Sequence, residues 1–535
     1  METSRSGAGG RLPTRHASAA DGTAGPGAAG SDPAFFDRPL FEDPRARNLS
    51  RVGVVDIGSN SVRLVVFDGA ARSPAYFYNE KVMCALGAGM AETGRLNALG
   101  RERALAALQR FQLLAQGMGL PSLTVVATAA VRDAIDGPDF CEEARRVTGL
   151  KIWVISGEME ARFSAQGVLL GWPGSYGLVC DIGGSSMELA EIRDGIVKKT
   201  TSSPLGPLKL RDIDGDGPER AKVIKDTLDR MSDQFGPQHD RLFLVGGSWR
   251  AIARIDMMRR AYPLQVLHEY RMSYDDVMAT VDLIAGSDPA ELRLQAGISN
   301  NRMALVPIAA EVLGRLVKVF KPADIAVSSY GIREGLLYEY MPKKLQDRDP
   351  LIEACRFFEA KDARLPGFGR TLYDFVLPLF PDAEPARLRL IRAACLLHDV
   401  SWRSHPDYRA EVCFEYATRA NLGGLKHWER IYLGLALLHR YRKNREGTPF
   451  EALYDLLDED SRKEAEILGK ALRFGAMLWM QPEAQMATLD WDPEARKLHM
   501  HMRRDVSALY GEVAESRLTS LANALQADLS VSLYE

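Results

Sequence analysis

The chain carries the same short pattern twice, at places separated by a domain-sized interval. The first copy is VVDIGSNSVRLVVF, with Asp56 at the end of an apolar run, and the second is LVCDIGGSSMELAEI, with Asp181 in that position. Each reads as a strand, a D-I-G-x-x-S turn and another strand. Glycine lets the backbone turn tightly with its N–H groups exposed, and the small hydroxyl residues add donors. One copy alone would be an ordinary hairpin. Two copies predict loops that suit phosphate oxygens, each with an Asp for a hydrated cation or a water.

The wider pattern around these turns predicts the class of fold. From Arg51 to about Pro342, strand-like runs such as Leu123–Ala127 alternate with helix-like runs such as Arg101–Gly117. This alternation predicts an α/β architecture with a substantially parallel sheet. After Lys343 the segments are long, amphipathic and rich in Leu, Ala, Arg and Glu, and strand signals nearly vanish. The last part of the chain is therefore expected to be a separate helical domain.

Composition excludes several classes of protein. Lys and Arg total 68 against 71 Asp and Glu, a net charge of −3, which argues against nucleic-acid binding through bulk basicity. No apolar run approaches the length of a membrane span. The cysteines are scattered, as expected in a reducing compartment, so a cytoplasmic protein is predicted. Residues 1–48 are mostly Gly, Ala, Ser and Pro; they predict a disordered tail and lack the apolar core of a signal peptide.

Two further glycine turns follow apolar strands and lead into helices. They are LFLVGGSWRAIARI, with Gly247 and Arg250, and IAVSSYGIREGLLYEY, with Arg333. Such junctions point backbone donors into a crevice, although each alone could be an ordinary connection between a strand and a helix. DIDGDG at Asp212–Gly217 begins like a calcium loop but has Val223 where a Glu belongs, so a surface loop is expected.

Together these segments carry a family resemblance. In order along the chain, the residues that carry it are DIGSNSVRL, ATAAVRDA, SGEMEARF, DIGGSSMEL, GGSWRAIAR and SSYGIREGLL. This set resembles the exopolyphosphatase/guanosine pentaphosphate phosphohydrolase (Ppx/GppA) family. The resemblance implies the two-lobed, RNase H-like fold of actin, sugar kinases and heat-shock ATPases, with the active site between the lobes. It also implies a C-terminal all-α HD-like domain and a homodimer. The expected parts are a tail at 1–48, lobe I at 49–170, lobe II at 171–342 and the HD-like domain at 343–535.

The resemblance assigns roles to the acidic residues. Glu160 in SGEMEARF matches the second acidic position of the family's E-E-A-R segment and is the candidate catalytic base. Glu158 is its competitor, because the sequence departs from the family pattern at this point. Asp181 and Glu188 lie on either side of the second turn, where they could hold Mg²⁺ together. His398–Asp399 resembles an HD dyad, but no His lies between Lys343 and Leu397 to complete a metal site, so a structural role is favoured.

The remaining candidates would bind phosphate. Ser185 stands where the family usually has a third glycine; a positive φ there would cost about 1 kcal/mol, and otherwise its hydroxyl adds a donor. Planar guanidinium groups suit bidentate contacts to phosphate. The candidate phosphate-binding residues are Asp56, Gly58, Ser59, Asn60, Ser61, Arg63, Arg132, Gly183, Gly184, Ser185, Ser186, Gly247 and Arg250.

These observations predict an enzyme that acts on a phosphoanhydride. The leading hypothesis is a Mg²⁺-dependent exopolyphosphatase that releases orthophosphate from the end of inorganic polyphosphate. The alternative within enzymes is a guanosine pentaphosphate (pppGpp) 5′-phosphohydrolase, and no nucleobase-recognition pattern is evident to favour it. The alternative from another class is a non-catalytic sensor of polyphosphate or nucleotide. No nucleic acid or membrane is expected as a partner.

Overall fold

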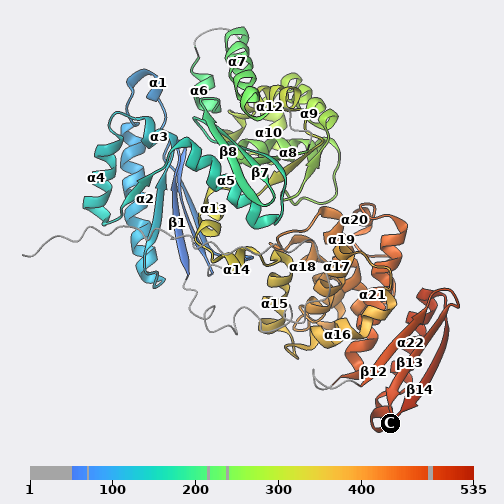
Figure 1. Ribbon diagram of the computed structural model, residues 1–535. Helices are drawn as coiled ribbons and strands as arrows, with labels where there is room; N and C mark the ends of the chain where they lie inside the picture. The colour runs from blue at the N-terminus through green and yellow to red at the C-terminus, as the bar shows by residue number, and fades with distance from the viewer. Residues whose placement is uncertain (1–50, 69–71, 214–216, 237–239, 480–485) are drawn as a thin grey trace, which may run out of the picture. The chain divides into compact units, whose positions relative to one another are not determined.

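The computed structural model describes residues 51–68, 72–213, 217–236, 240–479 and 486–535 (Figure 1). All of them belong to one unit of contacts, Arg38–Glu535. The tail predicted at 1–48, and the centre of the DIDGDG loop, lie outside the described residues.

The first sheet has five strands in the order β3-β2-β1-β4-β5. β1 pairs in parallel with β4 and β4 with β5, whereas β1–β2 and β2–β3 are antiparallel hairpins. The strands are β1 (Val52–Ile57), β2 (Ser61–Phe67), β3 (Tyr76–Met83), β4 (Leu123–Ala127) and β5 (Ile152–Val154).

The second sheet has six strands in the order β10-β11-β9-β6-β7-β8, and it repeats the same plan. β6 pairs antiparallel with β7 on one side and parallel with β9 on the other. The strands are β6 (Gly177–Ile182), β7 (Met187–Arg193), β8 (Ile196–Ser203), β9 (Arg241–Gly246), β10 (Arg271–Met272) and β11 (Asp324–Ser328). The predicted alternation of strands and helices is confirmed. The prediction of a substantially parallel sheet is right for β1–β4–β5 and for β6–β9–β11. It is wrong for the hairpin strands, because short turns within each repeat force antiparallel neighbours.

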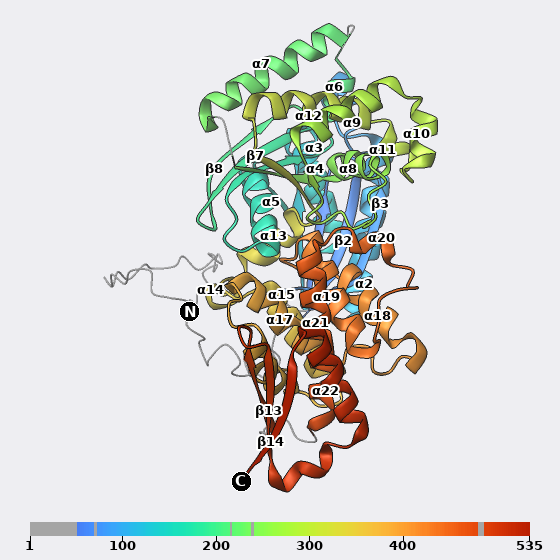
Figure 2. The same ribbon diagram turned by 90° about the vertical axis from the view of Figure 1, so that its right-hand side faces the viewer.

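Helices cover both sheets, and three apolar cores separate the layers. The core outside the first sheet contains Leu108 and Phe140, and the core outside the second contains Trp249 and Leu313. Figures 1 and 2 show α7, α9 and α12 grouped beside the second sheet. The helices are α1 (Met90–Thr93), α2 (Ala98–Gly117), α3 (Ala129–Asp133) and α4 (Gly137–Thr148) for the first lobe, and α6 (Pro207–Arg211), α7 (Gly217–Phe235), α8 (Gly247–Arg259), α9 (Tyr274–Gly286), α10 (Pro289–Gln295), α11 (Asn300–Met303) and α12 (Val306–Phe320) for the second.

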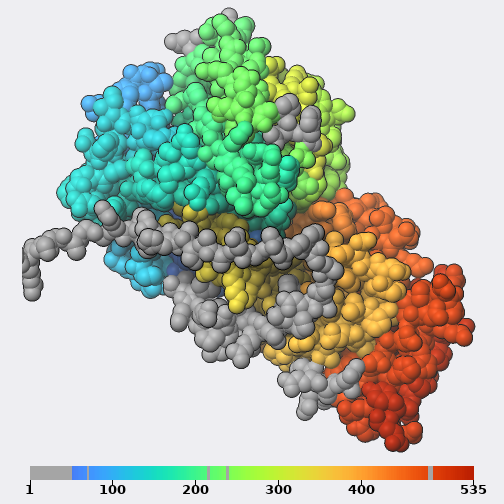
Figure 3. All heavy atoms as spheres, in the orientation of Figure 1, coloured from blue at the N-terminus to red at the C-terminus, as the bar shows by residue number. Residues whose placement is uncertain are grey.

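The third core lies between the two sheets and contains residues of α5 (Gly157–Gly171) and α13 (Ile332–Glu339). α5 packs on β6, β7 and β8, while α13 contacts β1 as well as α5. The backbones approach closely. A Cβ added to Gly335 would lie 1.7 Å from the Phe163 carbonyl oxygen, and one on Gly167 would lie 2.3 Å from that of Gly331. Only glycine fits at these two positions. On the face shown in Figure 3, atoms of the blue–cyan first lobe and the green second lobe lie in direct contact.

The C-terminal part is helical as far as Leu478 and then changes character. The prediction of an all-α domain is wrong for its last residues, which form a three-stranded sheet in the order β12-β13-β14. β13 and β14 are parallel and joined by a helix, a βαβ unit. The elements are α14 (Lys343–Gln346), α15 (Pro350–Asp362), α16 (Phe368–Val376), α17 (Pro385–Leu397), α18 (Arg409–Arg419), α19 (His427–Tyr441), α20 (Glu451–Tyr454), α21 (Glu459–Leu478), β12 (Ala487–Asp492), β13 (Lys497–Arg503), α22 (Glu512–Leu525) and β14 (Asp528–Tyr534).

Among the described residues, no helix has the length and apolar content needed to cross a membrane. The predicted limits of the lobes stay predictions. The packing shows that α5, at the predicted end of lobe I, contacts the strands of the second sheet.

Candidate active site

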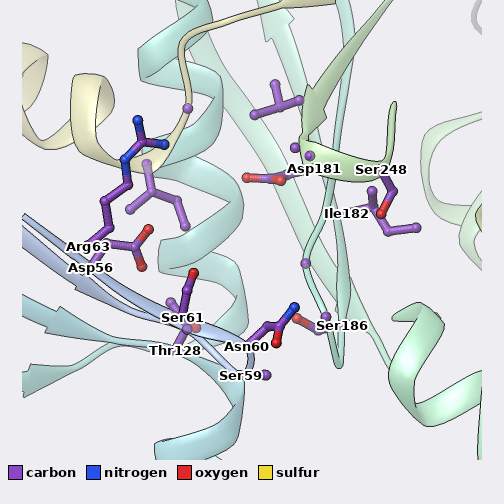
Figure 4. Close-up of a pocket in the computed structure, with 18 of the residues that line it drawn as sticks. Asp56, Ser59, Asn60, Ser61, Arg63, Thr128, Asp181, Ile182, Ser186 and Ser248 are labelled. Carbon is purple, nitrogen blue, oxygen red and sulfur yellow. The ribbon is translucent and has the colours of Figure 1, made fainter. Parts of the chain in front are cut away.

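A cavity of about 380 Å³ lies between the two repeated hairpins. Figure 4 shows Asp181 pointing across it toward the strands that carry Asp56 and Arg63. The predicted site residues that line it are Asp56, Gly58, Ser59, Asn60, Ser61, Arg63, Glu160, Asp181, Gly183, Gly184, Ser186, Gly247 and Arg250. Three predicted residues, Arg132, Ser185 and Glu188, are not part of the lining.

The two hairpin turns have the same backbone hydrogen bond. The Gly58 N–H donates to the Ser61 carbonyl oxygen, and the Gly183 N–H donates to that of Ser186, each at 3.0 Å. This bond closes the turn, and of the intervening residues Ser59, Asn60 and Gly184 line the cavity. The sequence repeat is therefore a structural repeat.

The two loops touch each other through Ser185. Its hydroxyl donates to the Ser59 hydroxyl at 2.8 Å, and both side chains are buried. Ser185 is not among the residues with positive φ. The residue that replaces the family's third glycine is therefore unstrained, and its hydroxyl links the two lobes instead of lining the cavity.

The strand register pairs each hairpin Asp with a side chain of different charge. Asp56 on β1 faces Arg63 on β2, and Asp181 on β6 faces Glu188 on β7. Residues paired in this way point to the same side of the sheet. The first hairpin thus presents an acid beside a base, and the second presents two acids.

Glu160 lies in the first turn of α5, whose N-terminus is capped by the Ser156 hydroxyl. Its side chain is buried, and burial together with nearby Asp181 raises the pKa of Glu160 to about 8. Arg132 opposes this rise: its Nη1 donates to Glu160 Oε2 at 3.2 Å and to the Ile155 carbonyl oxygen at 3.1 Å. Arg132 therefore contacts the carboxylate from outside the cavity and keeps it partly ionised near neutral pH.

Glu158 is placed differently. It is exposed, it is not part of the cavity lining, and hydrogen bonds at the helix N-terminus hold its pKa below the usual value. Of the two competing acids, only Glu160 faces the cavity. This placement favours Glu160 for the catalytic role, which stays a prediction.

The predicted metal ligands offer oxygen donors only. Burial raises the pKa of Asp181, and burial next to Glu160 and Asp181 raises that of Glu188. Glu188 Oε1 accepts from the Ser202 hydroxyl at 2.9 Å, whereas Oε2 is buried and has no hydrogen-bond partner among the described residues. In the part of the chain that the structure describes, no group of three or more His, Cys, Asp or Glu side chains is placed to hold a metal. Mg²⁺ often takes only one or two carboxylates, with waters and substrate phosphates completing its shell, so the donor set fits Mg²⁺.

Cationic side chains from both lobes surround these acids. The cluster consists of Arg63, Lys81, Arg250, Arg302 and Arg333. Burial and the neighbouring arginines lower the pKa of Lys81 to about 8 and that of Arg250 to about 10. Within the described ranges, neither Lys81 nor Arg302 forms an ion pair. Such mutual repulsion is relieved when a polyanion binds.

Some cavity residues were not identified as candidates from the sequence. Lys81 belongs to β3, a strand that contains several aromatic and apolar residues but none that is fully buried. Arg302 comes from a short helix, and its guanidinium packs against the backbone of Gly247, where a Cβ would lie 1.6 Å from Nη1. Thr128 and Arg333 also line the cavity. Arg333 follows a glycine turn named from the sequence, and Thr128 lies within the ATAAVRDA motif that carries the family resemblance; Lys81 and Arg302 had no sequence signal.

The His398–Asp399 dyad is engaged in structural contacts. Asp399 accepts hydrogen bonds from Arg364 at 2.6 and 2.7 Å, and buried His398 contacts the Cys395 carbonyl oxygen through Nδ1. These contacts agree with the structural role favoured from the sequence. The HD-like character of this part stays a prediction.

Comparison with known proteins now identifies the class. The sequence model of the Ppx/GppA phosphatase family matches residues 65–344, more than half of the chain. A second model, described as exopolyphosphatase, C-terminal, matches residues 368–531. The chain belongs to the Ppx/GppA phosphatase family. The predicted two-lobed, actin-like fold is confirmed, with the repeated sheets as its two lobes.

Individual relatives are distant. Retrograde regulation protein 2 of Saccharomyces cerevisiae is 26% identical over 443 residues, covering 75% of this chain and 74% of the relative. Exopolyphosphatase 1 of Mycobacterium tuberculosis is 25% identical over 326 residues, covering 57% and 92%. A crystal structure of the Aquifex aeolicus Ppx/GppA family member is 25% identical with a TM-score of 0.47, covering 54% and 96%.

Proposed function

We propose that this phosphatase is a Mg²⁺-dependent exopolyphosphatase that hydrolyses the terminal phosphoanhydride of inorganic polyphosphate and releases orthophosphate. One observation carries the proposal: the cavity combines a buried carboxylate, Glu160, with cationic side chains from both lobes. Phosphoanhydride hydrolysis requires an oriented water, a group that accepts its proton, and positive charge on the phosphate oxygens.

Glu160 fits the role of base. A carboxylate with a pKa near the working pH accepts a proton from water more readily than an ordinary one, and the ionised form is still populated. Arg132 fixes its orientation by the contact to Oε2. The two hairpin loops and the N-terminus of α8, which begins at Gly247, offer N–H donors to the phosphates.

Asp181 and Glu188 are the residues that would hold Mg²⁺. When bound, the ion would offset their mutual repulsion and add positive charge at the phosphate oxygens. Glu188 lies on the strand next to Asp181. Its Oε2 has no hydrogen-bond partner among the described residues, so this oxygen could act as a ligand of a hydrated ion.

The lining favours polyphosphate over pppGpp. Among the described residues that form the cavity wall, none is aromatic, so the wall offers no ring on which a guanine base could stack. Its cations are distributed over several elements, which suits a chain of phosphates. Exopolyphosphatase 1 of M. tuberculosis, a relative along most of its own length, adds support by its name.

A second candidate is a binding protein without catalysis. The yeast relative that matches three quarters of this chain is named as a regulatory protein, and that name favours a sensor of polyphosphate or nucleotide. The presence of Glu160, Asp181 and Glu188 in one place favours the enzyme.

Phosphate release from long-chain polyphosphate and from pppGpp, each with Mg²⁺ and with EDTA, separates these alternatives. We expect Mg²⁺-dependent release from polyphosphate and slower release from pppGpp. Faster release from pppGpp would support the nucleotide hydrolase, and binding without release from either would support the sensor. Sedimentation of the same sample tests the homodimer that the family resemblance implies.

A further inference from the structure

The loop between β11 and α13 connects the cavity to the C-terminal part of the chain. Its last residues, Gly331, Ile332 and Arg333, line the cavity. At its start, the Ser328 carbonyl oxygen accepts a hydrogen bond of 3.3 Å from Nη1 of Arg250. We give the name loop to Ser328–Arg333, which runs from the last residue of β11 to the second residue of α13. It therefore carries one cavity arginine and holds another.

The loop is fixed internally and on one side by His268. The Ser328 hydroxyl donates to the Tyr330 carbonyl oxygen at 2.8 Å, and the Tyr330 N–H donates back to that hydroxyl at 3.1 Å. The Ser329 N–H donates to His268 Nδ1 at 3.2 Å, which places the proton of this neutral imidazole on Nε2. The His268 ring stacks on Trp172, with centroids 4.2 Å apart.

The C-terminal part holds the same loop from the other side. The Tyr330 hydroxyl donates to Asn421 Oδ1 at 3.2 Å. His427 Nε2 lies 3.1 Å from the His268 carbonyl oxygen, which can only accept, so Nε2 is the donor. His427 Nδ1 then accepts from the Tyr262 hydroxyl at 2.9 Å.

Asn421 and His427 belong to a segment with a rigid backbone. Buried Arg430 donates to the carbonyl oxygens of Ala420 and Leu422 at 2.9 and 2.7 Å, on both sides of Asn421. We name residues 420–427 the clamp segment. Its contacts are hydrogen bonds of fixed direction, so it presents defined partners to the loop and not merely apolar surface.

We propose that the clamp segment is a positioning element of the active site: through Tyr330 and His268 it holds the loop Ser328–Arg333, and thereby Arg250 and Arg333, where they face the phosphates. The effect on affinity rests on the proposed function. Asn421 and His427 act through the loop and are positioning residues.

Asn421 gives the cleanest test, because its side chain is exposed and its truncation leaves the core intact. Asn421→Ala should raise the KM for polyphosphate about 3- to 10-fold, the size expected for one hydrogen bond, with little change in kcat or Tm. Tyr330→Phe should have the same effect, and the double variant should be no worse than either single one. Asn421→Asp keeps an oxygen acceptor and should retain most of the affinity. Arg419→Ala, at an exposed position of α18 outside the clamp segment, is the control.

Hydrogen exchange separates this proposal from the proposed function. Without substrate, the amides of Ser329 and Tyr330 should exchange faster in Asn421→Ala than in the wild type. If the wild type releases no phosphate but exchange still increases, the positioning stands and the proposed function is wrong. Two outcomes would contradict the proposal. In the first, the wild type is active, but amide exchange and KM are unchanged in Asn421→Ala and Tyr330→Phe. In the second, the effects of the two substitutions on KM add up in the double variant.

Discussion

The hairpins β1–β2 and β6–β7 share their turn and differ in the charge of the returning strand. Both close with the same glycine-to-serine backbone bond, and both deliver an Asp to the cavity. Opposite this Asp, the second strand carries Arg63 in the first hairpin and Glu188 in the second hairpin. If the proposed function holds, one backbone unit serves two chemistries: the first hairpin would favour bound phosphate, and the second, beside Glu160, would favour a cation and the attacking water.

This division of labour is tested most severely at Glu160. Glu160→Gln should lower kcat by about 10²- to 10⁴-fold and leave polyphosphate affinity within a few-fold, because the amide fills the same space but cannot accept the water's proton. Single-turnover phosphate release and equilibrium binding measure the two effects. Glu158→Gln, at an exposed position two residues away, is the matched control and should be fully active. Equal loss in both variants would refute the assignment.

The same variant should change how stability depends on pH. Folding raises the pKa of Glu160 from 4.5 to about 8, so the native state binds this proton more tightly than the unfolded chain does. The stability of the protein without divalent cations should therefore fall as the pH rises from about 4.5 to about 8. Melting curves of Glu160→Gln in EDTA should show a weaker fall over that range.

Two matched substitutions, each of which replaces a charged residue with Gln, test whether the two hairpins have different roles. Glu188→Gln should lower kcat by one to two orders of magnitude and raise the Mg²⁺ concentration needed for half-maximal rate, because one cation ligand loses its charge. Arg63→Gln should instead raise KM about 10-fold, the scale of a charge-assisted hydrogen bond, with an unchanged Mg²⁺ requirement. Mg²⁺ and substrate titrations of both variants read this out. The same phenotype in both would mean that the hairpins share one role.

Lys81 tests whether the cavity wall beside the first hairpin binds the phosphates. Because its pKa is lowered to about 8, its charge is present below that pH and is lost as the pH rises through it. Substrate affinity should weaken across this range in the wild type. Lys81→Met should raise KM about 3- to 5-fold at pH 7, the effect expected for the loss of one charged contact. It should also weaken the rise of KM with pH. An unaltered KM–pH curve would show that Lys81 does not contact the substrate.

The smallest effect is expected at the contact between the loops. Ser185→Gly restores the residue usual in the family and removes the hydrogen bond to Ser59, which should cost about 1 kcal/mol of stability or less. Since the backbone at this position is unstrained, no compensating gain is expected. Thermal unfolding measures the loss, and kcat should stay within 2-fold.

The sequence predicted the parts of this site that local patterns encode. The two hairpins and the pairing of Asp181 with Glu188 follow from residues close together in the chain. Arg302 could not be found in this way, because its place depends on packing against Gly247, far from it in the sequence. Lys81 was missed because a lysine on a strand without a buried side chain carries no local sign that it faces a cavity.

The C-terminal sheet shows a signal that was present and overlooked. KLHMHMR at Lys497–Arg503 alternates polar and apolar residues, the period of a strand with one buried face. Its Leu and Met side chains are buried while the histidines lie on the other face. Its neighbour β12 lies one short turn before it in the chain, whereas its other neighbour β14 follows only after α22, so only the hairpin with β12 was visible locally.

The glycine contact between α5 and α13 has a consequence for movement. Where side chains interlock, two bodies can shift by exchanging rotamers, but here backbone meets backbone at Gly167 and Gly335, and there are no rotamers to exchange. If the lobes open and close, we expect them to rotate about this contact. In such a rotation, residues farther from the contact move farther. The hairpin loops meet away from it at Ser59 and Ser185, so we expect the hydrogen bond between these two residues to break when the lobes separate.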